Sequence, residues 1–168
     1  VGPEAGVDPL AHYLSVLADK TGSLIATSAR FGAWLSGCDE TAIEVVTAYG
    51  ERIGVAFQLA DDLIDLSRGT EESGKTPGTD LREGVATLPV LYALESTDPG
   101  DARLRELLSQ PLVDDDLHAE ALTLLRAHPA MEQARAEVRR WAADARSVLA
   151  PLPDVPARAA LEALCDTV

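Results

Sequence analysis

The sequence predicts an all-α fold. Alanine and leucine, the strongest helix formers, are abundant, whereas aromatic residues make up only 4% of the chain. Apolar residues recur at helical spacing, prolines separate the segments that show it, and there is no strand-like alternation, internal repeat or low-complexity tract. With 168 residues and 46% hydrophobic content, the chain is long enough for a core, so we expect one helical domain over 1–168.

The first helix is expected from about Ala11 to Leu35. Residues 1–10 hold two prolines and two glycines, which favour a loop. Apolar residues at helical spacing follow, and Gly37 ends the segment. This helix also carries small residues that let another backbone approach closely, namely Thr21, Gly22, Ser23, Ala26 and Ala29.

A second helix completes the pair of core helices expected over 11–66. Asp39 or Thr41 can cap it, and Glu44 stands three residues after Thr41, as in a capping box. Residues 67–86 are rich in glycine and charge and lack apolar periodicity, so we expect a long loop there with room for one short helical turn.

Residues 87–168 are expected to form the C-terminal helices. Proline in a first helical turn and acidic residues at a helix start mark their beginnings. The expected helices run from Val90 to about Glu95, from Ala102 to Leu108, from Asp114 to about Ala127, from Ala130 to Ala150, and onward from Pro156.

Charge and composition exclude several functions. The formal net charge of −14, from 28 acidic residues against 14 Lys and Arg, repels a phosphate backbone and argues against nucleic-acid binding. No apolar run approaches the roughly 20 residues that cross a bilayer. Cys38 and Cys165 lack a CxxC spacing and no secretory leader precedes them, so we expect reduced thiols in the cytoplasm.

One apolar helix carries a row of polar side chains. Gln58, Asp61, Asp62 and Asp65 share one helical face, and the residues around them are hydrophobic: Val55, Leu59, Leu63, Ile64 and Leu66. Three close carboxylates in a partly dry cavity repel one another unless cations neutralise them. Mg²⁺ fits best, because it prefers oxygen ligands and can bridge to the phosphates of a substrate. The alternative is a solvated acidic stripe.

Two lysines are candidates for binding an anionic substrate. Lys75 lies between glycines that let the backbone bend toward a ligand, although a solvated loop lysine is the simpler reading of a Gly-Lys pair alone. Lys20 in the first helix can equally be explained by an acidic neighbour such as Asp19.

Other chemistry-bearing residues are not assigned to a site. His12, His118 and His128 lack a metal-ligand spacing and are interpreted as capping or surface residues. Trp34 and Trp141 are interpreted as core or interface residues. The acidic run at 114–116 suits a helix start.

The central motifs resemble the second aspartate-rich motif of trans-isoprenyl (polyprenyl) diphosphate synthases and the loop that follows it. They are Phe57-Gln58, Asp61-Asp62-Leu63-Ile64-Asp65, Gly74-Lys75, Gly78, Asp80-Leu81, Glu83-Gly84 and Thr87-Leu88-Pro89. Upstream, 18–24 is similar to the family's Lys-Thr helix, and the tail with Leu152-Pro153, Arg158, Leu161 and Leu164 is similar to its closing helix. The resemblance covers nearly the whole chain and is to the C-terminal half of the family.

The resemblance implies a helical bundle of the isoprenoid synthase type, of which this chain is the C-terminal half. It implies a prenyltransferase that condenses isopentenyl diphosphate with an allylic diphosphate, using Mg²⁺. By resemblance, Asp61 is a direct metal ligand, and Asp62 and Asp65 support it through bound water or as further ligands. Lys20 and Lys75 would hold the allylic diphosphate, and Thr21 and Gln58 would line its reacting end.

Two departures from the family pattern matter. Val85 stands where many members carry a lysine after the Glu-Gly pair, so one cationic contact is missing or replaced. The first aspartate-rich motif and the isopentenyl diphosphate site belong to the N-terminal half, which is absent from this sequence. We therefore expect the chain to be inactive alone, to expose apolar surface where that half would dock, and to belong to a homodimer as a full-length enzyme.

Three alternatives stay open. A noncatalytic partner subunit of a heteromeric synthase would keep the fold, although it has no need for intact Lys20, Gln58, Asp61, Asp62 and Lys75. A terpene cyclase of the same fold would also bind magnesium diphosphate, but the Gly-Lys loop and Thr-Leu-Pro favour elongating enzymes. A helical interaction module without a ligand is the third.

Overall fold

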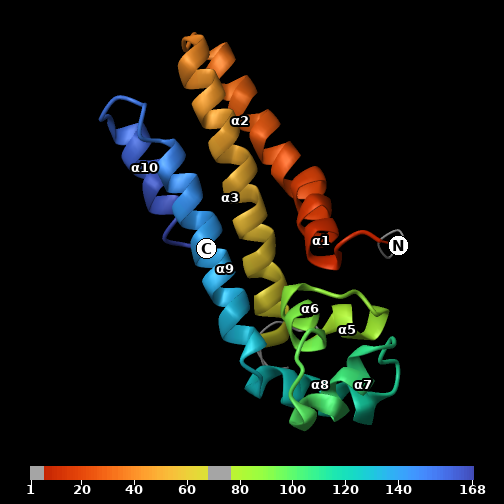
Figure 1. Cartoon of the computed structure of the whole chain (residues 1–168). Helices are drawn as coiled ribbons and strands as arrows, with labels where there is room; N and C mark the ends of the chain where they lie inside the picture. Colours follow the sequence, from red (N-terminus) through yellow and green to blue (C-terminus); the bar gives the residue numbers. More distant parts are fainter. Residues whose placement is uncertain (1–5, 68–76) are drawn as a thin grey trace. The chain divides into compact units, whose positions relative to one another are not determined.

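The computed structural model describes residues 6–67 and 77–168, and in these residues every regular element is helical (Figure 1). The all-α prediction is confirmed. In chain order the elements are α1 (Pro9–Leu17), a π-helical turn (Ala18–Gly22), α2 (Ser23–Leu35), α3 (Glu40–Ser67), α5 (Thr79–Glu83), α6 (Leu88–Leu94), a 3-10 turn (Pro99–Asp101), α7 (Ala102–Leu108), α8 (Asp115–Ala127), α9 (Ala130–Val148) and α10 (Pro156–Leu164).

The chain divides into two compact units. The first comprises the residues up to Ala60 together with Glu137–Val168, and the second comprises Asp61–Ala136. The boundaries fall within α3 and α9, so each of these helices contributes one part to each unit. The single-domain organisation expected from the sequence stays a prediction.

The first expected helix is interrupted at its middle by a π-helical turn. It also begins two residues earlier than expected, because Asp8 accepts hydrogen bonds from the backbone amides of Leu10 and Ala11 at 3.3 and 3.2 Å, and Pro9 fits the first turn. The π-helical turn over Ala18–Gly22 lies between α1 and α2. The prediction of one uninterrupted pattern is therefore wrong there, because the π turn inserts one residue and shifts the helical register.

Glycines let α2 approach α3. A β-carbon on Gly54 would lie 2.8 Å from the Gly22 Cα, and one on Gly50 would lie 2.8 Å from the Ala26 Cα. Both distances are shorter than real β-carbons tolerate, so no side chain fits at either position. The small residues of the first helix thus meet a second small pair, one turn apart, on α3.

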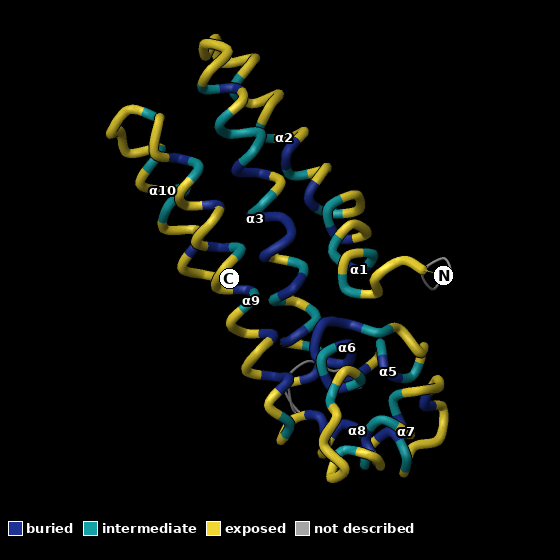
Figure 2. The backbone as a smooth tube through the Cα atoms, in the orientation of Figure 1, coloured by how far each residue is buried: buried dark blue, intermediate teal, exposed yellow. Residues whose placement is uncertain are grey.

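The core of the first unit lies between α3, α9 and α10. It consists of Tyr49, Ile53 and Ala56 from α3, Ala142, Ala145 and Leu149, and Cys165. Figure 2 shows the corresponding buried stretches in the middle of α3 and along α9. The Tyr49 hydroxyl donates to the Leu161 carbonyl at 2.9 Å, which satisfies the one polar atom that this tyrosine brings into the core.

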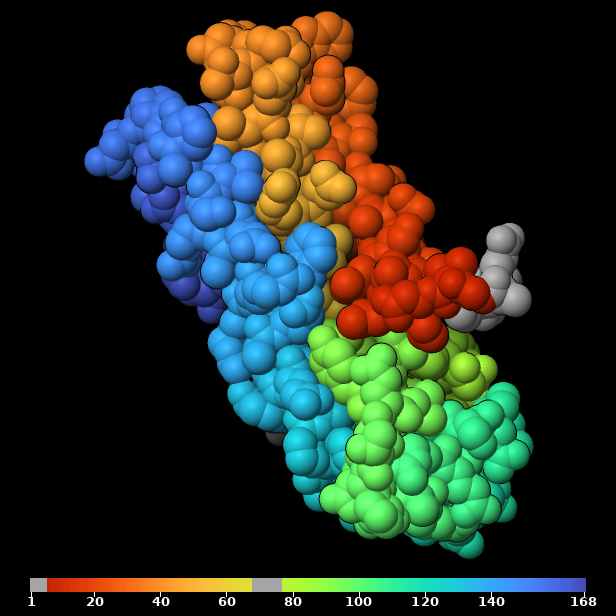
Figure 3. All heavy atoms as spheres, in the orientation of Figure 1, coloured from red at the N-terminus to blue at the C-terminus, as the bar shows by residue number. Residues whose placement is uncertain are grey.

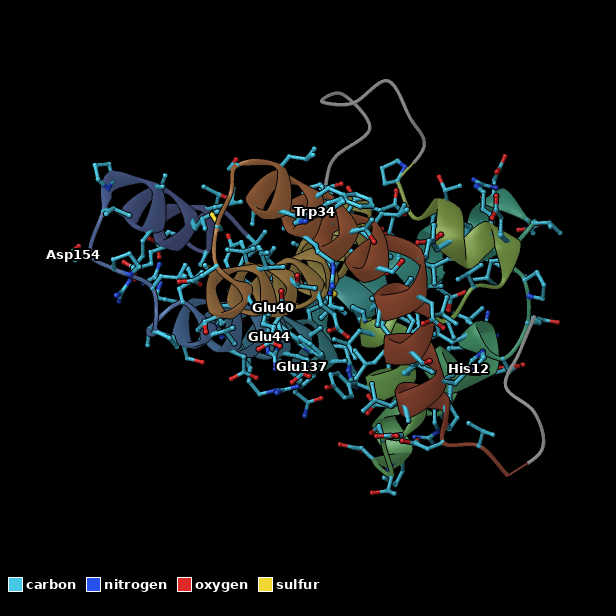
Figure 4. The ribbon with its side chains drawn as sticks, turned by 90° about the horizontal axis from the view of Figure 1, so that it is seen from above. His12, Trp34, Glu40, Glu44, Glu137 and Asp154 are labelled. Carbon is cyan, nitrogen blue, oxygen red and sulfur yellow. The ribbon has the colours of Figure 1, made fainter. Side chains whose placement is uncertain are left out.

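The structure shows which residue caps α3 and where Trp141 of α9 lies, two points that the sequence left open. The Asp39 carboxylate accepts from the Ala42 amide at 2.8 Å, so Asp39 caps α3. On α9, Glu137 accepts from the indole of Trp141 at 3.1 Å (Glu137 is labelled in Figure 4). Trp141 packs against the core cluster as expected.

The outer side of α2 carries large exposed apolar side chains. Leu24, Phe31, Trp34 and Leu35 are 67%, 50%, 62% and 80% exposed, and Ala26 is the one residue of α2 that is buried. Figure 3 shows α1 and α2 at the molecular surface, and Figure 4 marks Trp34 near the end of α2. Trp34 was interpreted from the sequence as a core or interface residue. It is not a core residue of this chain, and an interface role stays a prediction.

The second unit is built from the last turns of α3 and the short helices after it. Its interior is filled by leucines, including Leu81, Leu104, Leu107, Leu112 and Leu125. Arg103 of α7 binds Glu120 of α8 through two parallel hydrogen bonds of 2.9 and 2.7 Å. The short turn expected before residue 86 is α5, and α7 has the predicted bounds.

The described part of the chain contains no helix that is long and apolar enough to cross a membrane.

Candidate functional site

Thr21 and Gln58 are both candidate substrate-binding residues from the sequence, and they contact each other in the first unit. The Thr21 hydroxyl donates to the Gln58 side-chain oxygen at 3.0 Å, and both side chains are half-buried. Thr21 lies in the π-helical turn and Gln58 lies on α3. Lys20 precedes Thr21 in the same turn and is exposed, so its ammonium group is accessible to a ligand.

The close approach of Gly22 to Gly54 explains how this pair forms. Gly22 follows Thr21 directly, and Gly54 precedes Gln58 by one helical turn. Contact between the two glycines therefore brings Thr21, which is adjacent to Gly22, within hydrogen-bonding distance of Gln58, one turn beyond Gly54. Single π turns inside α-helices occur frequently at functional sites, and this one presents Lys20 and Thr21.

The three aspartates occupy the last turns of α3, in the second unit. Asp62 and Asp65 are half-buried, whereas Asp61 is exposed. The expectation that all three lie in a partly dry cavity is thus wrong for Asp61. Leu63 and Leu66, which alternate with them, are buried, because the helix turns one apolar face inward.

Asp65 has an unusual environment. Its Oδ2 atom is buried and has no hydrogen-bond partner among residues 6–67 and 77–168. A buried carboxylate oxygen without a partner is destabilising, and the last turn of α3 contains no basic residue of its own. The negative end of the helix dipole adds to the same effect. A bound cation would satisfy this atom.

The carboxylates alone do not form a complete metal cage. In residues 6–67 and 77–168 there is no group of three or more His, Cys, Asp or Glu side chains that could hold a metal ion by themselves. Mg²⁺ does not need such a cage, since it commonly takes one or two carboxylates and fills its remaining positions with water and substrate phosphates. The unpartnered Asp65 oxygen fits that mode, and the assignment of Asp61, Asp62 and Asp65 to Mg²⁺ stays a prediction.

The end of α3 that carries Asp65 is held by neighbours in the second unit. The Gly78 amide donates to the Asp65 carbonyl at 3.1 Å, and Arg126 donates through Nε to the Leu66 carbonyl at 2.6 Å. His118 Nε2 lies 2.9 Å from the Gly78 carbonyl. Three residues distant in sequence thereby meet at this helix end.

His118 was not singled out as a candidate from the sequence. It is 4% exposed, so its interpretation as a capping or surface residue is wrong. A signal was available, because His118 stands with Ala121, Leu122 and Leu125 at the i, i+3, i+4, i+7 spacing of a buried helical face. His128 does cap, since its Nδ1 accepts from the Ala130 amide at 3.1 Å at the start of α9.

The loop after α3 holds the remaining positions of the sequence-predicted set. Lys75 and Gly74 lie outside the described residues. Val85, where the family often has lysine, is 46% exposed and follows Gly84, whose φ of 71° ends α5. An apolar side chain at this exposed place supplies no charge to a ligand.

Comparison with known proteins gives consistent matches. A model of the polyprenyl synthetase family matches residues 4–125. The chain is 51% identical to a nonaprenyl diphosphate synthase of Mycobacterium tuberculosis and 47% identical to a dimethylallyltranstransferase of the same organism, in each case over 98% of this chain. It covers 49% and 50% of those relatives, so the chain spans about half the length of the curated relatives that it matches.

Solved structures agree. A geranylgeranyl pyrophosphate synthase from Corynebacterium glutamicum, crystallised with calcium and isoprenyl diphosphate, has a TM-score of 0.89 and 40% identity over 98% of this chain and 51% of its own. A heptaprenyl diphosphate synthase from Staphylococcus aureus has a TM-score of 0.85 and 25% identity over 95% and 50% of the two chains. The fold is thus that of half an isoprenoid synthase.

Proposed function

Because this chain belongs to the polyprenyl synthetase family, we propose that it is the part of a prenyltransferase that binds and ionises the allylic diphosphate. The reaction condenses isopentenyl diphosphate with an allylic diphosphate to give a longer trans-polyprenyl diphosphate. The observation that carries the proposal is the composition of α3, which holds Gln58 hydrogen-bonded to Thr21 and, seven residues later, Asp65 with a buried oxygen that has no partner in the described part of the chain.

The residues act on the charge that develops as the allylic carbon–oxygen bond breaks. Lys20, exposed at the π-helical turn, attracts the negative diphosphate, and Lys75 has the same role by resemblance. Asp61, Asp62 and Asp65 would hold Mg²⁺, which stabilises the departing diphosphate when bound. Thr21 and Gln58 orient each other through their hydrogen bond and line the reacting end of the prenyl group.

The reaction does not need a protein residue as the base that accepts the proton. The electron pair of the broken bond leaves with the diphosphate, and the double bond of isopentenyl diphosphate attacks the allylic cation. The condensed cation then loses a proton to form the new double bond, and the departed diphosphate is a suitable acceptor. No histidine is needed for this step, which agrees with the structural positions of His118 and His128.

A binding experiment tests the proposal directly. Calorimetry with Mg²⁺ and a nonhydrolysable allylic diphosphate should show binding to the chain and a loss of at least tenfold in affinity for Asp61→Ala. Asp154→Ala is the matched control, because Asp154 is an exposed aspartate in the loop before α10 (Figure 4). Equal affinity for wild type and Asp61→Ala would contradict the metal role.

We also propose that the 168-residue chain is inactive alone. Its relatives are about twice as long, and the first aspartate-rich motif and the isopentenyl diphosphate site belong to their other half by resemblance. A radiolabelled condensation assay with farnesyl diphosphate and Mg²⁺ should give no elongation by the purified chain. Substantial elongation would refute this part of the proposal.

The second candidate is a partner subunit of a heteromeric synthase, and the exposed apolar side of α2 is compatible with it, as it is with docking of the missing N-terminal half. It differs from the first in a measurable way, since a noncatalytic subunit would change a partner's activity without binding allylic diphosphate. Homodimer formation by the full-length enzyme and a cytoplasmic location belong to the first candidate. The two free cysteines, Cys38 and Cys165, support that location.

A further inference from the structure

The last turn of α3 is intrinsically weak. The final four carbonyls of a helix have no partner within it, and the dipole makes this end negative. In α3 three aspartates lie within the last seven residues, and the last turn contains no basic residue. Both effects favour fraying at the place where Asp65 must be held.

Donors from outside the helix satisfy two of these carbonyls. The Gly78 amide binds the Asp65 carbonyl at 3.1 Å, and the Arg126 guanidinium binds the Leu66 carbonyl at 2.6 Å. Gly78 has a φ of 71°, which glycine adopts without strain. A β-carbon there would also lie 3.0 Å from His118 Nε2, so the backbone of Gly78 is pressed against the imidazole.

His118 holds Gly78 from its other side. Its Nε2 atom lies 2.9 Å from the Gly78 carbonyl, and because a carbonyl oxygen only accepts, Nε2 carries the proton. The ring is 4% exposed on α8, a helix whose start is fixed by the Asp114 carboxylate at 3.0 Å from two backbone amides. The Gly78 carbonyl also accepts from the Leu81 and Arg82 amides of α5 at 3.1 and 3.4 Å, so α5 and His118 of α8 together hold the glycine whose amide binds the Asp65 backbone.

We propose that His118 is a positioning residue for the metal–diphosphate site. It fixes Gly78, Gly78 completes the last turn of α3, and that turn holds the Asp65 carboxylate in place. This inference rests on the proposed function. Its consequence is energetic: if the turn frays, only the fraction of molecules with an intact turn binds ligand, and the apparent dissociation constant rises in inverse proportion to that fraction.

Two substitutions separate the hydrogen bond from the packing. His118→Leu removes the donor and keeps a buried apolar side chain, whereas His118→Gln keeps a donor that can reach the Gly78 carbonyl. Leu125→Ala is the control, because Leu125 is a fully buried residue of the same helix. It should lower stability without changing the donor to Gly78.

Two measurements on the 168-residue chain follow these variants. Hydrogen exchange at the Gly78 amide reports the bond to Asp65 without any ligand, and calorimetry with Mg²⁺ and inorganic pyrophosphate reports the site. We expect His118→Leu to speed Gly78 exchange and weaken pyrophosphate binding by about tenfold. His118→Gln and Leu125→Ala should bind within about twofold of wild type.

The outcomes are distinct. Unchanged affinity and exchange in His118→Leu, or an equal loss of affinity in Leu125→Ala, would overturn the positioning role. If wild type does not bind magnesium pyrophosphate, the proposed function fails and the role of His118 in binding fails with it. Gly78 exchange would then still decide whether His118 holds the end of α3, because that measurement needs no ligand.

Discussion

Gly54 of α3 lies so close to Gly22 that a β-carbon on Gly54 would stand 2.8 Å from the Gly22 Cα and 3.2 Å from its amide nitrogen. These are backbone atoms, which cannot swing aside as a side-chain end can. The contact sets the distance between the π-helical turn and α3, and the hydrogen bond from Thr21 to Gln58 forms one residue away from it.

Gly54→Ala should therefore destabilise the chain. Overpacking against backbone in a well-packed interior costs about 1–3 kcal/mol, and urea unfolding followed by circular dichroism would measure it. Gly32→Ala is the matched control, because Gly32 is also helical and no described atom beyond its chain neighbours and its own helix backbone lies within 4 Å of the added β-carbon. This change should stabilise the chain by about 0.5–1 kcal/mol. Equal effects at both positions would show that the Gly22 contact is not tight.

Thr21→Val should remove the hydrogen bond to Gln58 while keeping the shape of the side chain. We expect a loss of about 1 kcal/mol in unfolding free energy, and Thr21→Ser, which retains a hydroxyl, should lose less. A double-mutant cycle with Gln58→Leu should give a coupling energy of about 0.5–1.5 kcal/mol. A coupling near zero would mean that the two side chains do not interact in solution.

Asp65→Asn should have opposite effects with and without ligand. Without ligand, the removal of a negative charge at the C-terminal end of α3 should stabilise the chain by about 0.3–1 kcal/mol. With Mg²⁺ and a diphosphate, affinity should fall, because an amide is a poorer ligand. Asp116→Asn at the start of α8 is the control with the reverse sign, since a carboxylate there is stabilising. Thermal unfolding and calorimetry give both readings.

Asp101 should contribute to acid sensitivity. Hydrogen bonds from Ser96 and from His128 Nε2, at 2.5 and 3.0 Å, lower the pKa of the Asp101 carboxyl. A folded-state pKa below the unfolded one gives stability that is present above pH 4 or so and is lost as the pH falls further. Unfolding free energy measured from pH 5.5 to 3 should fall less steeply in Asp101→Asn than in wild type. The same pH dependence of unfolding free energy in both proteins would show that Asp101 does not contribute to acid sensitivity.

Local signals in the sequence were enough for most of the helices. The bounds of α7 agree with the expectation, α8 is preceded by its Asp114 cap, and α9 differs only at its end, at Val148 instead of Ala150. Apolar spacing and capping residues act within a few positions, so they can be read from neighbouring residues. The choice between Asp39 and Thr41 needed coordinates, because either side chain can cap the same turn.

Part of the candidate site could likewise be predicted from the sequence, and part could not. Gln58, Asp61, Asp62 and Asp65 were identifiable on α3 because polar residues in an apolar helix stand out against their surroundings. His118 had the spacing of a buried face, but its partner is a backbone carbonyl 40 residues earlier, and no side-chain pattern marks that atom. The π-helical turn was likewise not predicted, because the segment was interpreted as one uninterrupted helix.

By itself, the sequence determined that this chain is helical, where most helices begin and end, and which helix carries the carboxylates, because those properties depend on residues within one or two turns of each other. The tertiary structure decided that Thr21 binds Gln58 and that Gly78 and His118 support the Asp65 backbone. It also decided that Asp61 stays exposed while one Asp65 oxygen is buried without a partner among the residues that the structure describes. Such contacts depend on how closely backbones pack across long separations, and packing distance is a property of the assembled fold.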